Sequence, residues 1–399
     1  AAIPMSESKN GLRHLVGSGR MDTRPWPPFS DEAVAFLADV SAKLMADPSV
    51  RSNPDVVSFA YWCRKGHLAR LKEAMAAENA HRLGRGLAFH VAPSNVPVNF
   101  AFSFAFGLLA GNANIVRVPS KPYPQVTLIC SAVSAVLEDH PRMEGRVTFV
   151  SYPADNAVTS EFSRMADARI LWGGDETVAS LRALPCKPRC VDVVFPNRYS
   201  ISVLDAQAVG ACDAAALQKL AERFYNDTYL MDQNACSSAR LVLWLQEADR
   251  AVTGRFWQAL RECASRAYGL QGAVAVDKYV QLCEDAIEGR ACEKMTFDPL
   301  LSVVRLSCLP EDLGSLHGKG GYFYECAIDS FEDVVDMLDE RCQTVTCFGV
   351  DAEKLRGTVL SHGARGVDRV VGVGSAMDID IVWDGYDLVG TLSRTVDAR

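Results

Sequence analysis

The chain has 399 residues, of which 49 are acidic and 41 basic, and its formal net charge at pH 7 is -8. This length suits two or three domains with sizeable cores, and a hydrophobic content of 49% is ordinary for a globular enzyme. Because the sequence contains no long cluster of Lys and Arg to displace phosphate counterions, the charge argues against a duplex nucleic-acid partner.

The 13 cysteines are scattered, without the close pairs of a zinc ribbon, so we predict no metal site. With no signal peptide in the sequence, we expect a reduced, cytoplasmic protein. The longest apolar stretch, residues 100–110, is too short to span a bilayer and is interrupted by Ser103. We therefore expect a buried helix at this position and no membrane span.

Residues 1–30 are rich in Gly, Pro and charge, which predicts an irregular arm, and hydrophobic spacing then predicts helices over 31–46 and 56–77. From residue 84, short apolar strands alternate with helices. The expected strands are 87–91, 113–118, 147–152 and 168–172, and the expected helices are 99–109, 123–137, 156–165 and 177–184. This alternation is typical of a parallel α/β sheet with helices on both faces, which binds ligands beyond the carboxyl ends of its strands.

The second half of the chain also reads as α/β. The expected helices are 214–224, 248–268, 331–338 and 352–360, and the expected strands are 240–245 and 344–348. The last stretch, 367–395, is glycine-rich with scattered β-formers. We expect it to pair with the sheet of another subunit, which would make the protein a homo-oligomer, either a dimer or a tetramer.

Cys236 differs from the other cysteines because it lies among small polar residues just before a β-rich run. Such a position leaves the sulfur accessible and places backbone N–H groups nearby, conditions in which a thiolate can act as a nucleophile. The alternative is that Cys236 is a small buried hydrophobe, as most cysteines are.

Gly173 and Gly174 follow the expected strand 168–172 and precede a helix. Glycine lets a phosphate approach the backbone, and the N-terminus of a helix supplies free N–H donors. An ordinary strand-to-helix turn explains the pair about as well.

Four motifs in order, APSNVPVNFAFS, ILWGGDETV, MDQNACSS and CQTVTCFG, are together similar to those of the LuxC-type acyl-CoA reductases of the aldehyde dehydrogenase superfamily. The resemblance implies an α/β, aldehyde dehydrogenase-like fold, with a parallel-sheet cofactor-binding domain, an α/β catalytic domain and a short oligomerisation arm. The implied division is an N-terminal helical region (1–83), a nicotinamide dinucleotide-binding domain (84–205), a catalytic domain (206–364) and a closing oligomerisation segment (365–399).

The same resemblance implies roles for single residues. Cys236 aligns with the nucleophile that forms a thioester with the acyl group. Asn95 aligns with the amide that holds the oxyanion together with the cysteine's own N–H, although a cap of the following helix is an alternative role for it. The aligned cofactor-contacting positions are Pro93, Ser94, Arg117, Ser120, Lys121, Gly173 and Gly174.

Two departures from the superfamily pattern affect the expected chemistry. Residues 194–198 stand where oxidising relatives carry a glutamate that activates water, and no carboxylate is present there. An acyl-enzyme without that base can exchange with coenzyme A or accept hydride, unless another carboxylate such as Glu325 approaches the site. Lys121 stands where NAD-preferring relatives have a glutamate, so Lys121 with Arg117 favours NADPH over NADH, unless both are solvated surface cations.

The sequence therefore predicts reduction of a fatty acyl-CoA to an aldehyde with NADPH (NADH being the second choice), through a thioester on Cys236. The donor can instead be an acyl-protein, with an acyl-protein synthetase or transferase as partner. Three alternatives stay open: a CoA-acylating aldehyde dehydrogenase for short aldehydes, a phosphate-ester reductase, and a subunit that transfers acyl groups without redox turnover.

Overall fold

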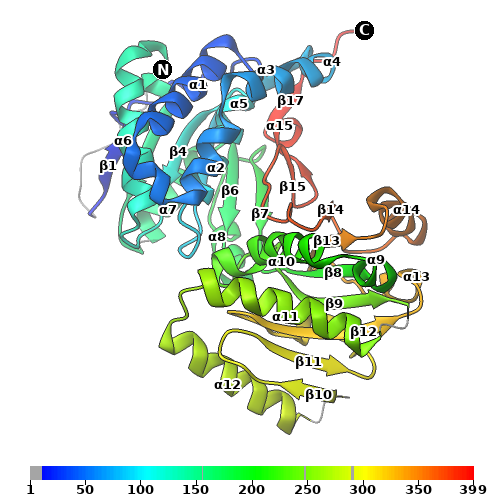
Figure 1. Cartoon of the computed structure of the whole chain (residues 1–399). Helices are drawn as coiled ribbons and strands as arrows, with labels where there is room; N and C mark the ends of the chain where they lie inside the picture. Colours follow the sequence, from blue (N-terminus) through cyan, green and yellow to red (C-terminus); the bar gives the residue numbers. More distant parts are fainter. Residues whose placement is uncertain (1–10, 155, 247–248, 289–291) are drawn as a thin grey trace. The chain divides into compact units, whose positions relative to one another are not determined.

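The structure is a computed structural model that describes residues 11–154, 156–246, 249–288 and 292–399. Its contacts divide the chain into two compact units, Ala1–Pro196 with Ile381–Arg399, and Asn197–Asp380 (Figure 1). Each unit is built on its own twisted sheet. In the described part of the chain, no helix has both the length and the apolar composition needed to cross a membrane.

The first unit contains a six-stranded sheet. Its strands, in spatial order, are β1 (Arg13–Val16), β5 (Val147–Ser151), β4 (Ala113–Arg117), β3 (Leu87–Val91), β6 (Ala168–Trp172) and β7 (Val191–Phe195). Only β1 runs antiparallel to its neighbour. The chain moves outward from β3 through β4 to β5, and then returns to place β6 on the other side of β3. The carboxyl ends of β3 and β6 therefore form a topological switch point, where sheets of this type bind ligands.

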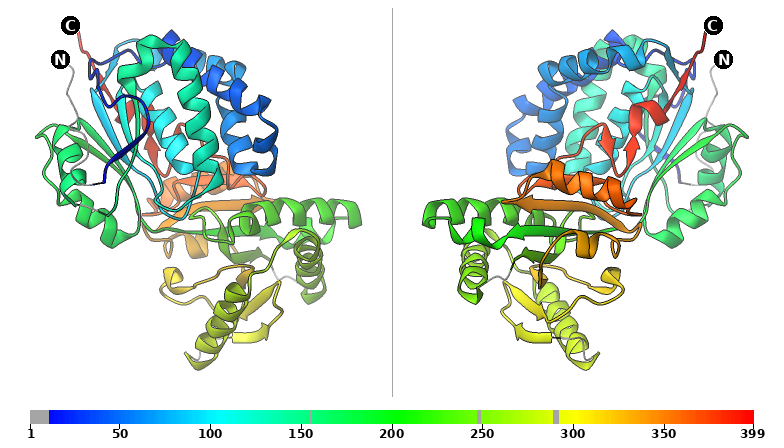
Figure 2. Two further views of the ribbon diagram at one scale, coloured as in Figure 1. Left: turned by 90° about the vertical axis from the view of Figure 1, so that its left-hand side faces the viewer. Right: turned by 90° about the vertical axis from the view of Figure 1, so that its right-hand side faces the viewer.

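Helices cover both faces of this sheet (Figure 2). They are α1 (Asp31–Ala46), α2 (Pro54–Trp62), α3 (Lys65–Ala74), α4 (Ala76–Asn79), α5 (Asn99–Leu109), α6 (Pro124–Asp139), α7 (Asn156–Met165) and α8 (Asp175–Arg182), with 3₁₀ turns at Pro48–Ser52 and Pro141–Arg146. Helix α5 is buried from Phe100 to Leu109, as its continuous apolar sequence predicts. The single helix expected over 56–77 is wrong: the extended backbone of Arg64 separates α2 from α3.

The second unit contains a seven-stranded sheet. Its order is β10 (Cys292–Thr296), β11 (Ser302–Leu306), β12 (Tyr322–Ile328), β9 (Ala239–Leu245), β8 (Tyr199–Asp205), β13 (Cys342–Phe348) and β14 (Arg369–Gly372). Only β10 is antiparallel to its neighbour. Its helices are α9 (Ala206–Gly210), α10 (Ala214–Thr228), α11 (Arg250–Ala267), α12 (Gly272–Ile287), α13 (Glu332–Val335) and α14 (Ala352–His362), with 3₁₀ turns at Tyr229–Met231 and Leu313–Ser315.

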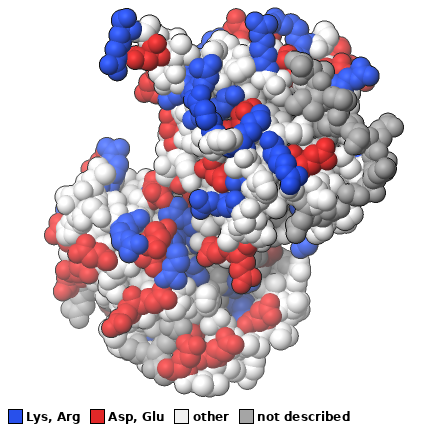
Figure 3. Space-filling model, turned by 180° about the vertical axis from the view of Figure 1, so that it is seen from behind, with Lys and Arg blue, Asp and Glu red and all other residues white. Residues whose placement is uncertain are grey.

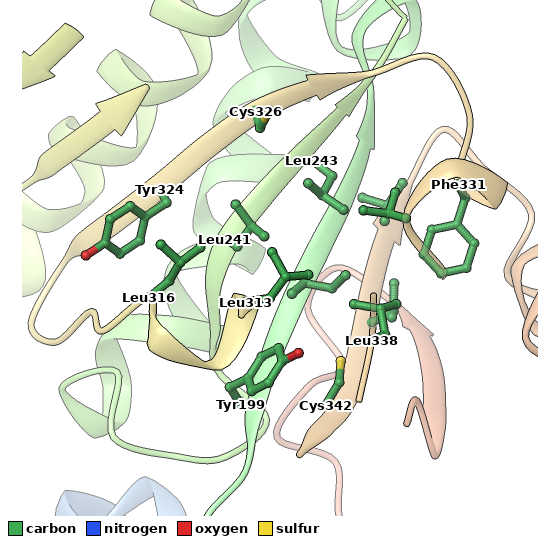
Figure 4. Packing of buried hydrophobic residues seen from close by; sticks show 14 of the residues in the cluster. Tyr199, Leu241, Leu243, Leu313, Leu316, Tyr324, Cys326, Phe331, Leu338 and Cys342 are labelled. Atoms are coloured by element: carbon green, nitrogen blue, oxygen red, sulfur yellow. The ribbon is translucent and has the colours of Figure 1, made fainter. Parts of the chain in front are cut away.

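Alternate residues of the central strands build two cores on opposite faces of this sheet. Leu241 and Leu243 pack on one face with Leu313, Leu316 and Phe331 (Figure 4). On the other face, Val242 and Trp244 of β9 join a second cluster. It also contains Phe224 of α10, Phe256 of α11 and Phe323 of β12. The sheet is thus buried on both sides, as expected for parallel strands.

The two units do not coincide with the segments expected from the sequence. Strand β8, placed before the boundary at residue 205, pairs with β9 and β13 of the second unit. The closing segment is shared, because β14 joins the second unit's sheet while Ile381–Arg399 belong to the first unit. A strand's unit is decided by its hydrogen-bonded neighbours, which a linear pattern does not contain.

The strands of the closing segment pair inside their own chain. Strand β17 (Ser393–Thr395) runs antiparallel to β2 (Arg82–Gly84), and β15 (Val382–Trp383) pairs with β16 (Tyr386–Asp387) before the short α15 (Leu388–Thr391). Within the chain, β14 pairs with β13 and β17 pairs with β2, and the expected pairing of this segment with another subunit's sheet stays a prediction. The oligomer itself stays a prediction.

On the face seen in Figure 3, described basic and acidic side chains are interspersed without a continuous basic stripe.

Candidate active site

Cys236 lies in a short connection between the 3₁₀ turn Tyr229–Met231 and β9, and we call residues 232–238 the cysteine loop. Two consecutive residues of this loop, Asp232 (φ 51°) and Gln233 (φ 60°), adopt the left-handed conformation. Such conformations cost about 1–3 kcal/mol each for residues other than glycine and persist only where surrounding bonds fix them. Hydrogen bonds made by Gln233, Ser200 and Ser238 fix the loop.

Gln233 is buried and uses its whole amide group. Its Nε2 donates to the carbonyl oxygens of Ala239 (3.0 Å) and Tyr322 (2.9 Å). Its Oε1 accepts from the backbone N–H groups of Gly321 (3.0 Å) and Tyr322 (3.1 Å). One side chain therefore joins the loop to the start of β9 and the start of β12.

The backbone beside the sulfur is held in the same way. Ser200 Oγ donates to the carbonyl oxygen of Cys236 (2.6 Å) and accepts from the N–H of Thr344 (3.1 Å). Ser238 Oγ donates to the carbonyl oxygen of Asp227 on α10 (2.7 Å). Cys236 itself is partly exposed, in contrast to the fully buried Cys342. Its sulfur is thus carried on a fixed backbone without being enclosed in the core.

Arg240 brings positive charge to the cysteine loop. Burial lowers the pKa of its guanidinium, and the negative charges of Tyr199 and Cys236, when ionised, act in the opposite direction. The guanidinium lies over the Tyr199 ring at 5.0 Å, and Nη1 is 3.4 Å from His317 Nδ1. A nearby cation favours a thiolate. By contrast, burial raises the pKa of Cys342 to about 12, which keeps that sulfur protonated.

Asp227 anchors a second segment beneath the loop. Its carboxylate accepts from the N–H groups of Gly374 (2.6 Å) and Ala376 (3.0 Å). Burial raises the pKa of Asp227 to about 6, although both of these hydrogen bonds act to lower it. Asp227 and the structural role of Gln233 could not be recognised from the sequence, because their partners lie far along the chain.

Glu325 does not act as a base near the cysteine. Its Oε1 accepts from Arg305 Nε (2.8 Å), and its Oε2 accepts from the indole N–H groups of Trp244 (2.8 Å) and Trp257 (2.7 Å). The carboxylate is buried and held by these three donors. The expectation that Glu325 can replace the missing glutamate is therefore wrong.

In the first unit, the switch point brings together two predicted segments, residues 92–98 after β3 and Gly173–Gly174 after β6, which we call the switch-point loops. Ser94 and Asn95 are exposed and Pro93 is buried. Helix α5 begins after Val98 without a side-chain cap, and the Asn95 side chain makes no hydrogen bond to any described residue. Asn95 therefore does not cap α5.

The glycine turn is close-packed but carries negative charge. Gly174 is the N-cap of α8, and the N–H of Gly173 donates to the carbonyl oxygen of Phe195 (3.2 Å). A Cβ on Gly173 would come within 3.0 Å of Thr177 Cγ2. Asp175 and Glu176 occupy the first turn of α8 and compete with any phosphate for its dipole.

The predicted cofactor cations differ in their surroundings. Arg117 ends β4, its guanidinium lies 4.4 Å from the centre of the Tyr152 ring, and its Nη2 donates to the Tyr152 carbonyl oxygen (3.4 Å). Ser120 and Lys121 are exposed in the following turn. The ammonium group of Lys121 pairs with no described carboxylate, so it is available to an anion.

A buried polar chain lies under the switch-point loops. His90 of β3 is bonded through Nδ1 to Ser103 Oγ (2.7 Å) and through Nε2 to Asn114 Oδ1 (2.9 Å), and Trp172 Nε1 donates to the same Ser103 oxygen (3.3 Å). Burial lowers the pKa of His90 to about 4, against the effect of its bond to Asn114, so the ring is neutral. From its sequence, this strand is predicted only as a short apolar run.

The fold of the chain is shared with solved structures. Two solved structures share the fold: a 1-pyrroline-5-carboxylate dehydrogenase from Thermus with bound NAD (13% identity, 92% of this chain and 78% of that chain, TM-score 0.61) and an oxidoreductase from Marinobacter aquaeolei (14% identity, 94% and 87%, TM-score 0.62). At these identities the likeness concerns the fold alone, which is that of the aldehyde dehydrogenases.

The family follows from the sequence. The family model described as acyl-CoA reductase (LuxC) matches residues 67–270, slightly more than half of the chain, and the chain belongs to this family. It is similar to a long-chain acyl-protein thioester reductase of Aliivibrio fischeri (27% identity over 164 residues, 40% of this chain and 32% of the relative). It is also similar to long-chain acyl-protein thioester reductase 2 of Photobacterium leiognathi (24% over 168 residues, 42% and 33%). The matched segments span about a third of the relatives' length.

Proposed function

We propose that this protein reduces an acyl thioester to an aldehyde through an acyl group held on Cys236. The observation that carries the proposal is a partly exposed sulfur on a rigid loop beside Arg240, together with Glu325 fully engaged by three donors. Thioester hydrolysis needs a base to activate water. Because Glu325 is engaged elsewhere and residues 194–198 carry no carboxylate, we expect the acyl group to persist on sulfur long enough for reduction.

The reaction begins at the sulfur. The Cys236 thiolate attacks the carbonyl carbon of the donor, the S–C bond to the donor thiol breaks, and that thiol leaves as a thiolate that takes a proton from water. The N–H of Cys236 and the Asn95 amide are the proposed donors to the oxyanion. A reduced nicotinamide supplies hydride to the acyl carbon when bound. Collapse of the resulting adduct then releases the aldehyde and restores the thiolate.

The proposed cofactor site is the switch point of the first unit. Pro93, Ser94 and the Gly173–Gly174 turn border the crevice in which sheets of this topology bind dinucleotides. The Thermus dehydrogenase of the same fold has NAD bound. The exposed Lys121 favours a cofactor with a 2′-phosphate, hence NADPH over NADH.

The donor is proposed as acyl-CoA or an acyl-protein, the second because both curated relatives are named acyl-protein thioester reductases. The homo-oligomer, the cytoplasmic location and an acyl-protein synthetase or transferase partner stay predictions.

A spectrophotometric panel tests the reaction. Acyl-CoA esters of graded chain length are combined with NADPH or NADH, and Cys236→Ala is expected to lose both acyl labelling and cofactor oxidation, by at least about 10⁴-fold. Cys308→Ala, which removes an exposed cysteine of the same unit, is the matched control and should keep both. Reduction at an undiminished rate by Cys236→Ala would refute the nucleophile.

The acidic first turn of α8 favours one second candidate. Asp175 and Glu176 weaken attraction for a pyrophosphate, which suits a subunit that transfers acyl groups without redox turnover. That protein would be acylated on Cys236 and yet oxidise neither NADPH nor NADH in the same panel.

A further inference from the structure

Helix α12 (Gly272–Ile287) exposes much of its apolar surface and buries two charged residues, although Leu282 packs against the core of the second unit. The residues that it buries are Lys278 and Asp285. The residues that it exposes include Val276 (62% exposed), Tyr279 (57%) and Ile287 (84%). A surface helix ordinarily turns its apolar stripe inward and its charges toward solvent. The outward apolar stripe therefore calls for a partner that the described residues of the chain do not supply.

Hydrogen bonds hold the helix in this orientation. Lys278 Nζ donates to the carbonyl oxygen of Pro299 (2.9 Å). Asp285 Oδ2 accepts from the hydroxyl groups of Tyr322 (2.5 Å) and Tyr324 (2.7 Å). Rotating the stripe inward would break these bonds and leave polar groups of the strand without partners. The apolar face is thus a fixed feature of the second unit.

The exposed stripe is continuous. Residues 276, 279, 280, 283 and 287 share the spacing of one helical face. Phe297, after β10, extends it, since its ring lies 5.6 Å from the ring of Tyr279. The other exposed large hydrophobic side chains of the described residues are scattered over the chain. Helix α12 lies at the outer margin of the second unit, beside β10 and β11 (Figures 1 and 2). A contiguous apolar surface of this kind is typical of a protein interface.

The charges around the stripe select the kind of partner. The exposed charged residues of α12 and its C-cap are acidic, namely Asp277, Glu284 and Glu288, whereas the one basic residue of α12, Lys278, is buried. A second copy of the chain, packed helix against helix, would bring these acidic residues together. We propose that α12 and Phe297 form the docking surface for a partner protein that presents an apolar helical face bordered by lysine or arginine.

One residue of β12, Tyr322, bonds both to α12 and to the cysteine loop. Tyr322 bonds to Asp285 of α12 through its hydroxyl group and to Gln233 of the loop through its backbone N–H and carbonyl oxygen. The N–H of Gly320 also donates to the carbonyl oxygen of Asp232 (2.9 Å), and the space above Gly320 is filled by Val274 of α12. A partner docked on α12 would therefore bind a helix that is linked to the loop of the proposed nucleophile through Tyr322 and Gly320. Docking itself does not depend on the proposed reaction.

Two designed amphipathic peptides test the surface. They share a leucine face and differ in carrying lysine or glutamate on the polar face, and their binding to the full chain is followed by fluorescence anisotropy. The lysine peptide should bind at least about tenfold more tightly than the glutamate peptide. Tyr279→Ser with Ile287→Ser should weaken the lysine peptide at least about tenfold, because two buried apolar contacts are lost. Leu360→Ser, at an exposed leucine of α14 (72%), is the matched control and should change nothing.

A charge variant separates the two contributions. Asp277→Asn with Glu284→Gln keeps the apolar stripe and should weaken the lysine peptide about threefold, an effect that added salt mimics. Equal binding of both peptides, no binding of the lysine peptide, or unchanged affinity after the serine substitutions would overturn the proposal. So would sedimentation of the wild-type chain as a dimer that those substitutions dissociate, since the stripe would then be covered by a second copy. Unfolding midpoints check that each variant is folded.

Discussion

The cysteine loop of the second unit and the switch-point loops of the first differ in how much of their geometry the chain itself determines. In the cysteine loop, Gln233 makes four hydrogen bonds and Ser200 holds the carbonyl of Cys236, the proposed nucleophile. In the switch-point loops, Ser94 and Asn95 are exposed, and the Asn95 side chain bonds to no described residue. A covalent nucleophile must be positioned before its substrate arrives, whereas loops that receive a ligand present groups for the ligand to satisfy.

Among the predicted substitutions, replacing Gln233 of the cysteine loop should lower the free energy of unfolding most. Gln233→Ala leaves two backbone N–H groups and two carbonyl oxygens without their partner, inside a buried site. We expect the free energy of unfolding to fall by about 3–5 kcal/mol, measured by urea denaturation. The matched control is Gln218→Ala, since Gln218 bonds to Glu222 on an exposed helix face and should matter by less than about 0.5 kcal/mol. Equal losses in the two variants would mean that the loop is not held by Gln233.

In the switch-point loops, we expect a substitution to change the reaction rate and not the stability. Asn95→Ala removes a side chain with no intramolecular bond, so the unfolding free energy should be unchanged. If its amide binds the oxyanion, the rate of thioester reduction should fall about 10²–10³-fold. Steady-state kinetics and denaturation of one preparation check both halves. Loss of stability without loss of rate would assign Asn95 to the fold, contrary to its proposed role.

Arg240 lies beside the cysteine loop, and we expect its replacement to change the electrostatic environment of Cys236. Arg240→Gln removes the cation beside Cys236, so acylation at pH 7 should slow about tenfold. The rate should recover as the pH is raised, because the thiolate then forms without help. A pH profile of Cys236 alkylation measures this recovery. A uniform loss at every pH would instead indicate disordered packing around Tyr199.

The same comparison explains what could be predicted from the sequence. Strand and helix alternation located β3, β4, β5 and β6, because burial on both faces leaves continuous apolar runs. The cysteine loop and both switch-point loops were located because they are short motifs at strand ends. These signals are local, and they extend over a few residues of the chain.

The bonds that fix the site are not local. Gln233 reaches Tyr322, which is 89 residues further along the chain, and Asp227 reaches Ala376, which is 149 residues further. The pairing of β17 with β2 and the membership of β8 in the second sheet have the same origin. Glutamine and aspartate are common in turns and on surfaces, so nothing in their neighbours along the chain identifies these two as buried anchors.

Of the effects predicted, that of replacing Asp227 is the smallest. The substitution distinguishes the anchoring of residues 374–376 from the reactivity of Cys236. Its pKa is raised to about 6 by burial, above the ordinary value of 3.8, so the folded state binds the proton more tightly than the unfolded state. The stability contributed by this protonation is complete below about pH 4 and is lost as the pH rises through about 6.

Between pH 5 and pH 7 the wild-type chain should therefore lose about 1 kcal/mol of unfolding free energy more than Asp227→Asn does, because the amide does not titrate. Urea denaturation of both proteins at the two pH values measures the difference. The Asn side chain can still accept a hydrogen bond from Gly374, so the closing segment stays attached and Cys236 should remain reactive toward alkylation. If the two proteins instead showed the same pH dependence, the carboxylate would be ionised throughout this range, and its hydrogen bonds to Gly374 and Ala376 would outweigh the effect of burial.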